Sequence, residues 1–411
     1  MTQAQTSQAD IIILGGGLVG LALAAALDSS GLRVIVVDPA DPEERKGAAY
    51  DGRTTAVSSS SMRMLGATGV LDHLSQPGCP IQAIRVADGL APGALTFEPG
   101  ADGEPLGVMH ENRSLRAALL ARADAGENID LRWKSPTAEV RREENGATVR
   151  LASGEVLTAP LIVGAEGRRS PSREAAGIRM ARWSYDHKAI VGTLAHEAPH
   201  EHIAYEIFYP SGPFALLPMT DLADGTHRSA IVWSAKTGMA DGLLALSDAD
   251  FAAEAEAAMG GFLGRIRLLT PRSSYPLGFH HAVRITDRRL ALVGDAAHAI
   301  HPIAGQGVNL GFRDAAALAE VLVDGARLGL DLGDAQLLTR YQRWRALDGF
   351  SVALATDGLT RLYGVPGRAA SAVRRFGMAL IDRLGPVKHS LNAAARGNSG
   401  DLPRLLVGEA L

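Results

Sequence analysis

Short apolar runs alternate with longer apolar stretches along much of this chain. One run covers Ile11 to Leu14, a second ends at Asp38, and the apolar stretch from Leu21 to Leu27 lies between them. A short apolar run bounded by turn residues predicts a strand covered on both faces, and the longer stretch predicts a helix. Two further runs predict strands of the same kind, at residues 161–163 and 290–293. This alternation indicates an α/β fold with a doubly wound sheet and helices on both faces.

The first strand, helix and second strand carry a glycine pattern that is typical of dinucleotide binding. Gly15 permits a sharp turn, Gly17 lets the backbone approach a pyrophosphate, and Gly20 lets helix and strand pack closely. Asp38 ends the second strand, where a carboxylate hydrogen-bonds a ribose diol. The alternative is a glycine-rich turn in an ordinary βαβ unit. The motif alone does not distinguish NAD from FAD.

Two later turns favour the flavin. Residues 161–173, LIVGAEGRRSPSR, place Glu166 and a basic cluster after a predicted strand, and residues 292–314, LVGDAAHAIHPIAGQGVNLGFRD, form the other turn. Gly294 would let a buried Asp295 reach a ribityl or ribose hydroxyl. A helix is predicted from about Val308 to Leu328. Backbone amides at its N-terminus can approach a planar ring or a phosphate. The residues expected to supply these amides are Gly305, Gln306, Gly307, Val308 and Asn309.

These three segments, in this order, resemble the FAD-dependent class A aromatic hydroxylases, which are the para-hydroxybenzoate-hydroxylase-like enzymes. The resemblance spans nearly the whole chain and is strongest to the ubiquinone-biosynthesis hydroxylases, whose HPxAGQGxNLGxRD segment is matched from His301 to Asp314. Residues 51–65, 111–120 and 228–234 are also similar to that subgroup. One position departs from the family, in which the middle turn usually reads Gly-Ala-Asp-Gly: this chain has Glu166 in place of the aspartate.

The resemblance implies a monooxygenase that uses FAD, NAD(P)H and dioxygen, and that hydroxylates a polyprenylated phenol through a flavin C4a-hydroperoxide. It implies contacts from Arg53 and Arg113 to the flavin or its phosphates, and it makes Pro302 and Gly305 candidates for the pocket wall. It does not decide between NADPH and NADH. Two alternatives stay open: a flavin hydroxylase of a small soluble aromatic compound, and a non-catalytic flavoprotein that scaffolds a biosynthetic complex.

No catalytic base can be named from the residues. Four side chains are candidates, and each has an ordinary structural role as its alternative: Tyr205, Tyr209, His280 and His281. Asp295, His298 and His301 have a spacing that suggests a metal, but the flavin already accounts for them, so no metal is expected. The single cysteine, Cys79, excludes a disulfide framework and a cysteine-rich metal site, and is expected to be an inert packed thiol.

Because the three turns must meet on one cofactor, the FAD-binding domain is expected to be discontinuous, with residues 1–80, 106–180 and 284–345. Residues 81–105 and 181–283 show strand-like alternation and are expected to form an antiparallel substrate domain, and 346–411 a C-terminal helical region.

Composition limits the remaining possibilities. The 411 residues carry a net charge of −4 and no basic run with interleaved aromatic residues, so nucleic acid is not an expected partner. The polar first ten residues and the lack of a long apolar run predict a cytoplasmic protein, either soluble or peripheral at the inner face of the membrane. Contact with other ubiquinone-biosynthesis proteins stays open.

The segment 366–396 is amphipathic if helical, with an apolar face that includes Phe376 and Leu380 and a strongly basic opposite side. A helix of this kind either lies on an anionic membrane or packs on its own FAD domain. The basic residues are Arg368, Arg374, Arg375, Arg383, Lys388 and Arg396.

Overall fold

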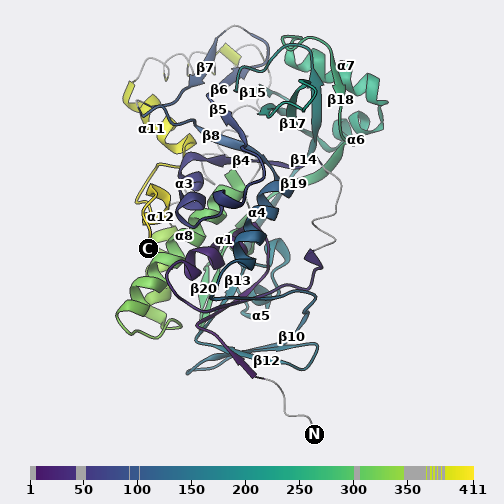
Figure 1. Cartoon of the computed structure of the whole chain (residues 1–411). Helices are drawn as coiled ribbons and strands as arrows, with labels where there is room; N and C mark the ends of the chain where they lie inside the picture. The colour runs from purple at the N-terminus through teal and green to yellow at the C-terminus, as the bar shows by residue number, and fades with distance from the viewer. Residues whose placement is uncertain are drawn as a thin grey trace.

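The computed structural model describes residues 6–42, 52–91, 93–100, 102–299, 306–346 and 385–411, with six single positions between 367 and 381. Figure 1 shows the predicted α/β region in the lower half of the molecule and a large sheet with two helices in the upper half. The central sheet of the lower half has six strands, and all except the edge strand β20 run parallel. Its order is β20 (Thr286–Asp287), β21 (Leu290–Leu292), β13 (Leu161–Gly164), β2 (Ile11–Leu14), β3 (Val34–Val37) and β9 (Ile129–Arg132).

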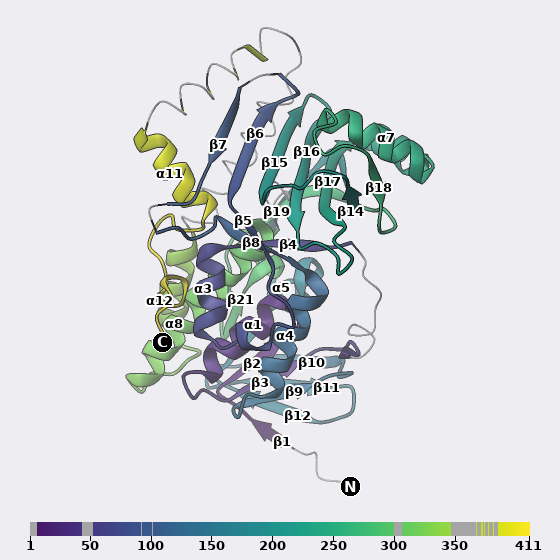
Figure 2. The ribbon, with the colours of Figure 1, turned by 45° about the horizontal axis from the view of Figure 1, so that its top comes forward.

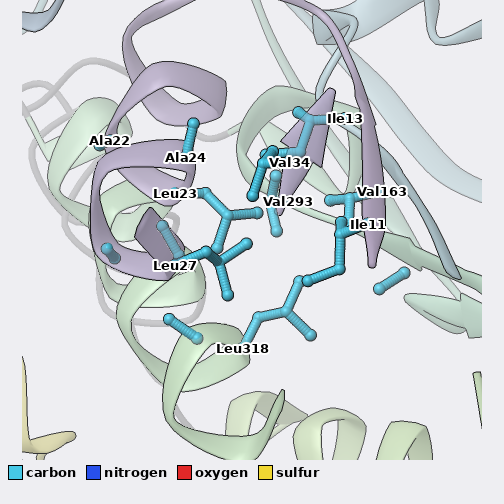
Figure 3. Packing of buried hydrophobic residues seen from close by; sticks show 14 of the residues in the cluster. Ile11, Ile13, Ala22, Leu23, Ala24, Leu27, Val34, Val163, Val293 and Leu318 are labelled. Carbon is cyan, nitrogen blue, oxygen red and sulfur yellow. The ribbon is translucent and has the colours of Figure 1, made fainter. Parts of the chain in front are cut away.

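Helices cover one face of the central sheet. Figure 3 shows Ile11, Ile13 and Val163 from the strands, together with the neighbouring Val293, pointing toward leucines of two helices in a single apolar core. The packing explains Gly20 and the alanines of the first helix, because small residues let this helix lie close to the sheet and to the helix beside it. The helices that contact one another here are α1 (Leu18–Asp28), α4 (Asn112–Asp124) and α8 (Gln306–Arg327), with α3 (Ser59–Ala67) and α12 (Arg404–Val407) packed on α8.

The opposite face of the central sheet corrects one expectation. Ile12 and Leu14 point to that face, since successive strand residues alternate, and both are buried. A second sheet covers them in place of helices, and Val149 and Leu157 of this sheet belong to the same hydrophobic core. Its four strands are β1 (Thr6–Gln8), β12 (Val156–Ala159), β11 (Ala147–Leu151) and β10 (Thr137–Arg142). Residues 137–159 form three successive antiparallel strands that suit this layer, because alternate residues of β11 and β12 are buried.

The large upper sheet is mostly antiparallel, as expected. One pair is parallel, because β6 comes from an earlier part of the chain and lies beside β15 in the same direction (Figure 2). The strand order is β22 (His298–Ala299), β19 (Ser273–Ala282), β14 (Met180–His196), β17 (His227–Lys236), β16 (Gly212–Met219), β15 (Ile203–Tyr209), β6 (Ala83–Asp88) and β7 (Ala94–Phe97), with β18 (Ile266–Leu268) paired to β14. Helices α6 (Thr237–Ala245) and α7 (Asp248–Met259) pack on one face. The predicted boundaries of the FAD-binding domain, the substrate domain and the C-terminal helical region stay predictions.

A three-stranded sheet lies between these two halves. It has the order β4 (Thr54–Ser58), β8 (Gly107–Glu111) and β5 (Cys79–Ile81). Cys79, Ile81 and Met109 of this sheet share a core with Ala204 and Met219 of the large sheet. The lower face of the large sheet is therefore the one that packs toward the dinucleotide-binding half. The remaining short elements are η1 (Leu71–His73), η2 (Gly167–Arg169), α5 (Pro171–Ala175) and η3 (Gly294–Ala296).

The C-terminal segment packs on the protein through some of its basic residues. Arg374 is buried and pairs with Asp88 of β6 at 2.9 Å. Arg396 is also buried, and it pairs with Asp102 and Glu104 at 2.6 and 2.9 Å. These two side chains therefore do not belong to an exposed basic face. Helix α11 (Gly385–Ala395) lies beside β7 in Figure 2. No helix in the described part of the chain is both long enough and apolar enough to span a membrane.

Candidate functional site: a dinucleotide cradle at the meeting of three turns

The glycines of the first turn have different physical roles. Gly15 has a φ of +112°, and a Cβ there would lie 2.4 Å from the carbonyl oxygen of Ala165. A Cβ at Gly20 would lie 2.0 Å from the carbonyl oxygen of Gly15. Both positions therefore require glycine for the fold itself. A Cβ at Gly17 would meet nothing within 4 Å, so this position faces open space above the turn.

The N-terminus of α1 is suited to an anion. Gly17 is its N-cap, and among the described residues no side chain caps the helix and no acidic residue lies in its first turn. The free amides and the helix dipole favour a negatively charged group at this position. A cavity of about 650 Å³ lies beside the turn, and its lining includes Gly16, Arg113 and Trp133. The residues present thus fit the pyrophosphate of a dinucleotide.

Asp38 holds the first turn through two backbone hydrogen bonds, and its contact with a ribose stays a prediction. Its carboxylate accepts hydrogen bonds of 2.8 Å from the amides of Gly16 and Ala40, and the side chain is buried. A carboxylate has about four acceptor sites, so a contact to a ribose is compatible with these bonds. Trp133 packs against Gly16 so closely that a Cβ there would lie 2.4 Å from the indole ring. Neither contact of Asp38 was evident from the strand pattern, which predicted only its position.

The second and third turns lie against each other, as their shared cofactor required. Arg173 is fully buried and donates to the carbonyl oxygens of Ala296 and Arg168, at 3.1 and 2.9 Å. Arg168 lies 3.4 Å from the carboxylate of Asp295. His280 places its Nε2 2.9 Å from the Asp295 carbonyl oxygen. Asp295 was predicted to be buried, but its side chain is 44% exposed, because only its backbone is enclosed by these contacts.

Glu166, the residue that departs from the family pattern, folds back on its own turn. Its carboxylate accepts hydrogen bonds from the hydroxyl groups of Ser170 and Ser172 and from the Ser172 amide, at the start of α5. Burial raises the pKa of Glu166, although these hydrogen bonds act in the opposite direction. The longer side chain thus reaches the α5 N-terminus, and its predicted cofactor contact stays a prediction.

The buried charge in the third segment is Asp314 rather than Asp295. Asp314 is fully buried on α8 and accepts a hydrogen bond of 2.9 Å from the Gly294 amide. Arg345 Nε donates to it at 2.8 Å, and His298 Nε2 lies 2.8 Å away. Burial by itself would raise the pKa of Asp314, but His298 and Arg345 hold that pKa below its usual value. Asp314, with Arg345 and His298, holds the Gly294 turn through a hydrogen bond from α8. The group could not be found from the sequence because its members are up to 47 residues apart.

The predicted amides of the α8 N-terminus are only partly described. Gln306, Gly307 and Val308 form the first turn of α8. The Asn309 side chain accepts from the Ser58 amide at 2.9 Å and donates to the Ala56 carbonyl oxygen at 2.8 Å, so it ties α8 to β4. A cofactor contact by these backbone amides stays a prediction. The pocket candidates Pro302 and Gly305 lie outside the described residues.

The two predicted arginines lie on neighbouring segments. The carbonyl oxygen of Arg53 accepts from the Asn112 amide at 3.0 Å, which places Arg53 beside the start of α4. Arg113 Nε lies 2.6 Å from Glu111, and the other oxygen of Glu111 accepts from Arg228 at 2.9 Å. Arg113 and Arg228 both line the cavity beside the dinucleotide turn. Their contacts with a flavin stay predictions.

The tyrosine candidates for phenol activation lie on the helix side of the large sheet. The Tyr205 ring packs on Phe262 with ring centres 4.4 Å apart, and the Tyr209 hydroxyl donates to the Ala258 carbonyl oxygen. Both belong to the core formed with α7. Glu206 alternates with them and therefore shares the opposite face with Ala204, which packs toward the dinucleotide-binding half. An acid within an apolar strand is the feature of the sequence that could have pointed to Glu206 as a functional residue.

Two other aromatic groups lie near the turns. Burial raises the pKa of Tyr275, while the charges of Arg168 and Arg53 act to lower it, so this phenol lies near both guanidinium groups. His281 stacks on Phe279 and on His298, with ring centres 6.2 and 6.1 Å apart. The role predicted for His281 in phenol activation stays a prediction.

The fold and the three turns define a class of flavoprotein. The family model described as an FAD binding domain matches residues 8–349. The chain therefore belongs to this family, and the predicted resemblance to FAD-dependent aromatic hydroxylases is confirmed. It is an FAD-dependent monooxygenase.

Individual relatives align over almost the whole chain. The ubiquinone hydroxylase UbiL of Rhodospirillum rubrum is 42% identical over 406 residues, which cover 98% of this chain and 94% of the relative. The human mitochondrial ubiquinone biosynthesis monooxygenase COQ6 is 29% identical, over 94% of this chain and 92% of the relative.

Solved structures share the fold. PqsL of Pseudomonas aeruginosa, solved in complex with 2-aminobenzoylacetate, aligns at a TM-score of 0.71 with 25% identity over 92% of this chain and all of that chain. The p-nitrophenol 4-monooxygenase PnpA of Pseudomonas putida aligns at a TM-score of 0.78 over 97% of this chain and all of that chain, with 17% identity. The second likeness shows the fold alone.

The open space at Gly17 supplies a clean test of the cradle. We expect Gly17→Val to fold normally, since its Cβ meets nothing, but to lower FAD affinity at least tenfold because the side chain occupies the approach to the α1 amides. Flavin absorbance of the purified protein and FAD titration of the apoprotein measure this effect. Gly238→Val on α6, where a Cβ also meets nothing, is the control. A Gly17→Val protein with full flavin content would place the cofactor elsewhere.

Proposed function

We propose that this protein hydroxylates the aromatic ring of a polyprenylated phenol in ubiquinone biosynthesis, with NAD(P)H as electron donor and dioxygen as oxygen donor. The observation that carries the proposal is the 42% identity to a ubiquinone hydroxylase along 98% of the chain. The COQ6 monooxygenases support it at greater distance. The relatives' names identify the pathway, and the polyprenyl group and the electron donor are our extension of them.

Different residues would have distinct roles in this function. The α1 amides, Asp38 and Arg113 would hold the adenosine and pyrophosphate end of FAD, and Asp295 the ribityl end. Bound FAD would supply the redox chemistry that activates dioxygen for transfer to the ring. Arg173 and Asp314 fix the backbone of the second and third turns, so the groups that face the cofactor are already in place before it binds. Pre-formed donors of this kind lose little conformational entropy on binding.

The large sheet would supply the substrate wall. Its lower face carries apolar side chains, among them Ala204, Leu217 and Ala230, which suit a hydrophobic ring with a prenyl chain. Contact with a membrane is not required by this assignment, since Arg374 and Arg396 of the basic segment are used in internal ion pairs.

The test is mass spectrometry of quinone lipids from cells that lack this gene. We expect a ubiquinone precursor one oxygen short to accumulate, because the step that adds this oxygen is lost. The structure of that precursor would identify the ring carbon, and complementation by the wild-type gene is the control. A normal quinone profile in a strain without a related hydroxylase would contradict the proposal and favour a small soluble aromatic substrate. A strain that regains ubiquinone from a Gly17→Val variant unable to bind FAD would instead favour a scaffolding role.

A further inference from the structure

The only cysteine of the chain lies among histidines at the junction between the three-stranded sheet and the large sheet. Cys79 begins β5, and His200 and His202 lie in the turn between β14 and β15. One ligand atom from each of these three residues lies within 4.8 Å of the others. We propose that Cys79, His200 and His202 form a binding site for a zinc-like divalent cation, separate from the flavin site.

The distances suit a tetrahedral ion. Cys79 Sγ lies 3.4 Å from His202 Nδ1. Zinc bonds of about 2.3 Å to sulfur and about 2.0–2.1 Å to nitrogen place two such ligands roughly 3.5 Å apart in a tetrahedron. The thiol and this imidazole therefore already have the separation of two ligands of one ion. The third ligand is a ring nitrogen of His200, which lies within 4.8 Å of the other two ligand atoms. It would have to move by less than the length of one metal–ligand bond.

His200 is held in the orientation that zinc ligands use. Its Nε2 lies 2.9 Å from the Met219 carbonyl oxygen, and since a carbonyl only accepts, Nε2 carries the proton. Nδ1 is then the basic nitrogen, and it accepts from the His202 amide at 3.0 Å. Ligating histidines typically donate their second nitrogen to a carbonyl or carboxylate in this way. Metal binding would replace the hydrogen bond from the His202 amide at Nδ1 and keep the bond to Met219.

The turn that presents the two histidines has an unusual backbone. Glu201 and His202 have φ values of 51° and 57°, in the left-handed region that residues other than glycine seldom adopt. This conformation brings the His200 and His202 rings to 5.5 Å between centres, beside the cysteine. A cavity lined by these residues also includes Asp221 and His227, whose side chains pair with each other at 2.9 Å.

The chemistry of the donors favours zinc over other cations and over thiol redox chemistry. One sulfur and two imidazole nitrogens are soft or borderline ligands, which disfavours magnesium and calcium. The Cys79 thiol is buried, which shields it from oxidants in solution. A bound cation would displace the thiol proton and hold the thiolate.

The position of the site indicates a structural function. β5 belongs to the three-stranded sheet, whereas the histidine turn belongs to the large sheet, and the His200 bond to Met219 adds β16. A cation bound to all three side chains would join the two sheets at the edge of the proposed substrate wall.

The test is metal binding by the full-length, FAD-loaded protein without a polyhistidine tag, after treatment with a chelator. We expect one Zn²⁺ per chain in competition with a chromogenic chelator, and a thiolate-to-cobalt charge-transfer band when Co²⁺ is added. Cys79→Ser should lose that band, and both Cys79→Ser and His202→Ala should bind Zn²⁺ at least tenfold more weakly. Flavin content should be unchanged in both variants, since neither residue lies in the cradle.

His202 is exposed, so His202→Ala keeps the test valid if the buried Cys79→Ser variant fails to fold. His389→Ala on α11 is the matched control, because it removes an exposed histidine outside the cluster. Wild-type protein that binds less than one Zn²⁺ per chain would overturn the proposal. Unchanged zinc affinity in His202→Ala would overturn it as well.

Discussion

Asp314→Ala is expected to destabilise the protein by about 3–5 kcal/mol and to lower its flavin content. The substitution removes an acid in direct contact with two buried basic groups, Arg345 and His298, whose side chains are 2% and 4% exposed. Removal of one member of a buried ion pair leaves a desolvated charge, and this costs several kcal/mol. The Gly294 amide also loses its acceptor, so the turn that contains Asp295 loses its hydrogen bond to α8.

Chemical denaturation followed by circular dichroism measures the stability, and flavin absorbance measures the cofactor. Asp324→Ala is the matched control on the same helix, because Asp324 pairs with Arg340 and Arg404 at the surface, where ion pairs contribute about 1 kcal/mol or less. If Asp314→Ala fails to fold, Asp314→Asn keeps the shape and one acceptor and is expected to show the same direction of change. Equal stabilities for the Asp314 and Asp324 variants would contradict this role.

Glu206→Gln is expected to stabilise the protein above neutral pH and to have little effect in acid. Burial raises the pKa of Glu206 from its ordinary value of 4.5 to about 7. Between these two values the folded state binds more protons than the unfolded state, so stability falls as the pH rises. At about 1.4 kcal/mol per pH unit, ionisation of this buried acid costs the wild type about 3 kcal/mol by pH 8. The amide avoids that cost.

The measurement is the free energy of unfolding of both proteins at pH 4.5 and pH 8, with the same denaturant. The gain from Glu206→Gln should appear at pH 8 and vanish near pH 4.5, where the glutamate is largely protonated in the folded protein. Glu254→Gln on the exposed side of α7 is the control and should shift stability by no more than about 0.5 kcal/mol at either pH. A Glu206→Gln protein that is less stable at pH 8 would show that the carboxylate has a stabilising partner.

Local chemistry and periodicity determined much of this protein from the sequence. The strands at Ile11–Leu14 and Leu161–Gly164 and the helix that begins at Gln306 follow from apolar runs and turn residues, which act over a few positions. The glycine turn was predictable because only glycine fits at positions 15 and 20. A Cβ at either position would lie too close to a backbone carbonyl oxygen. The convergence of the three turns followed from the need for one shared cofactor.

The tertiary structure decided what depends on distant partners. The strands of residues 137–159 could not be placed on the central sheet from their pattern, because an exposed-buried alternation does not say which surface covers it. The burial of Asp314, the exposure of Asp295 and the internal pairing of Arg374 each depend on residues far away in the chain. Cys79 and His202 are 123 positions apart, and only the folded chain brings the thiol and the imidazole within ligand distance. Sequence periodicity reports which side of an element is covered, whereas charge pairing and metal ligation require knowledge of what covers it.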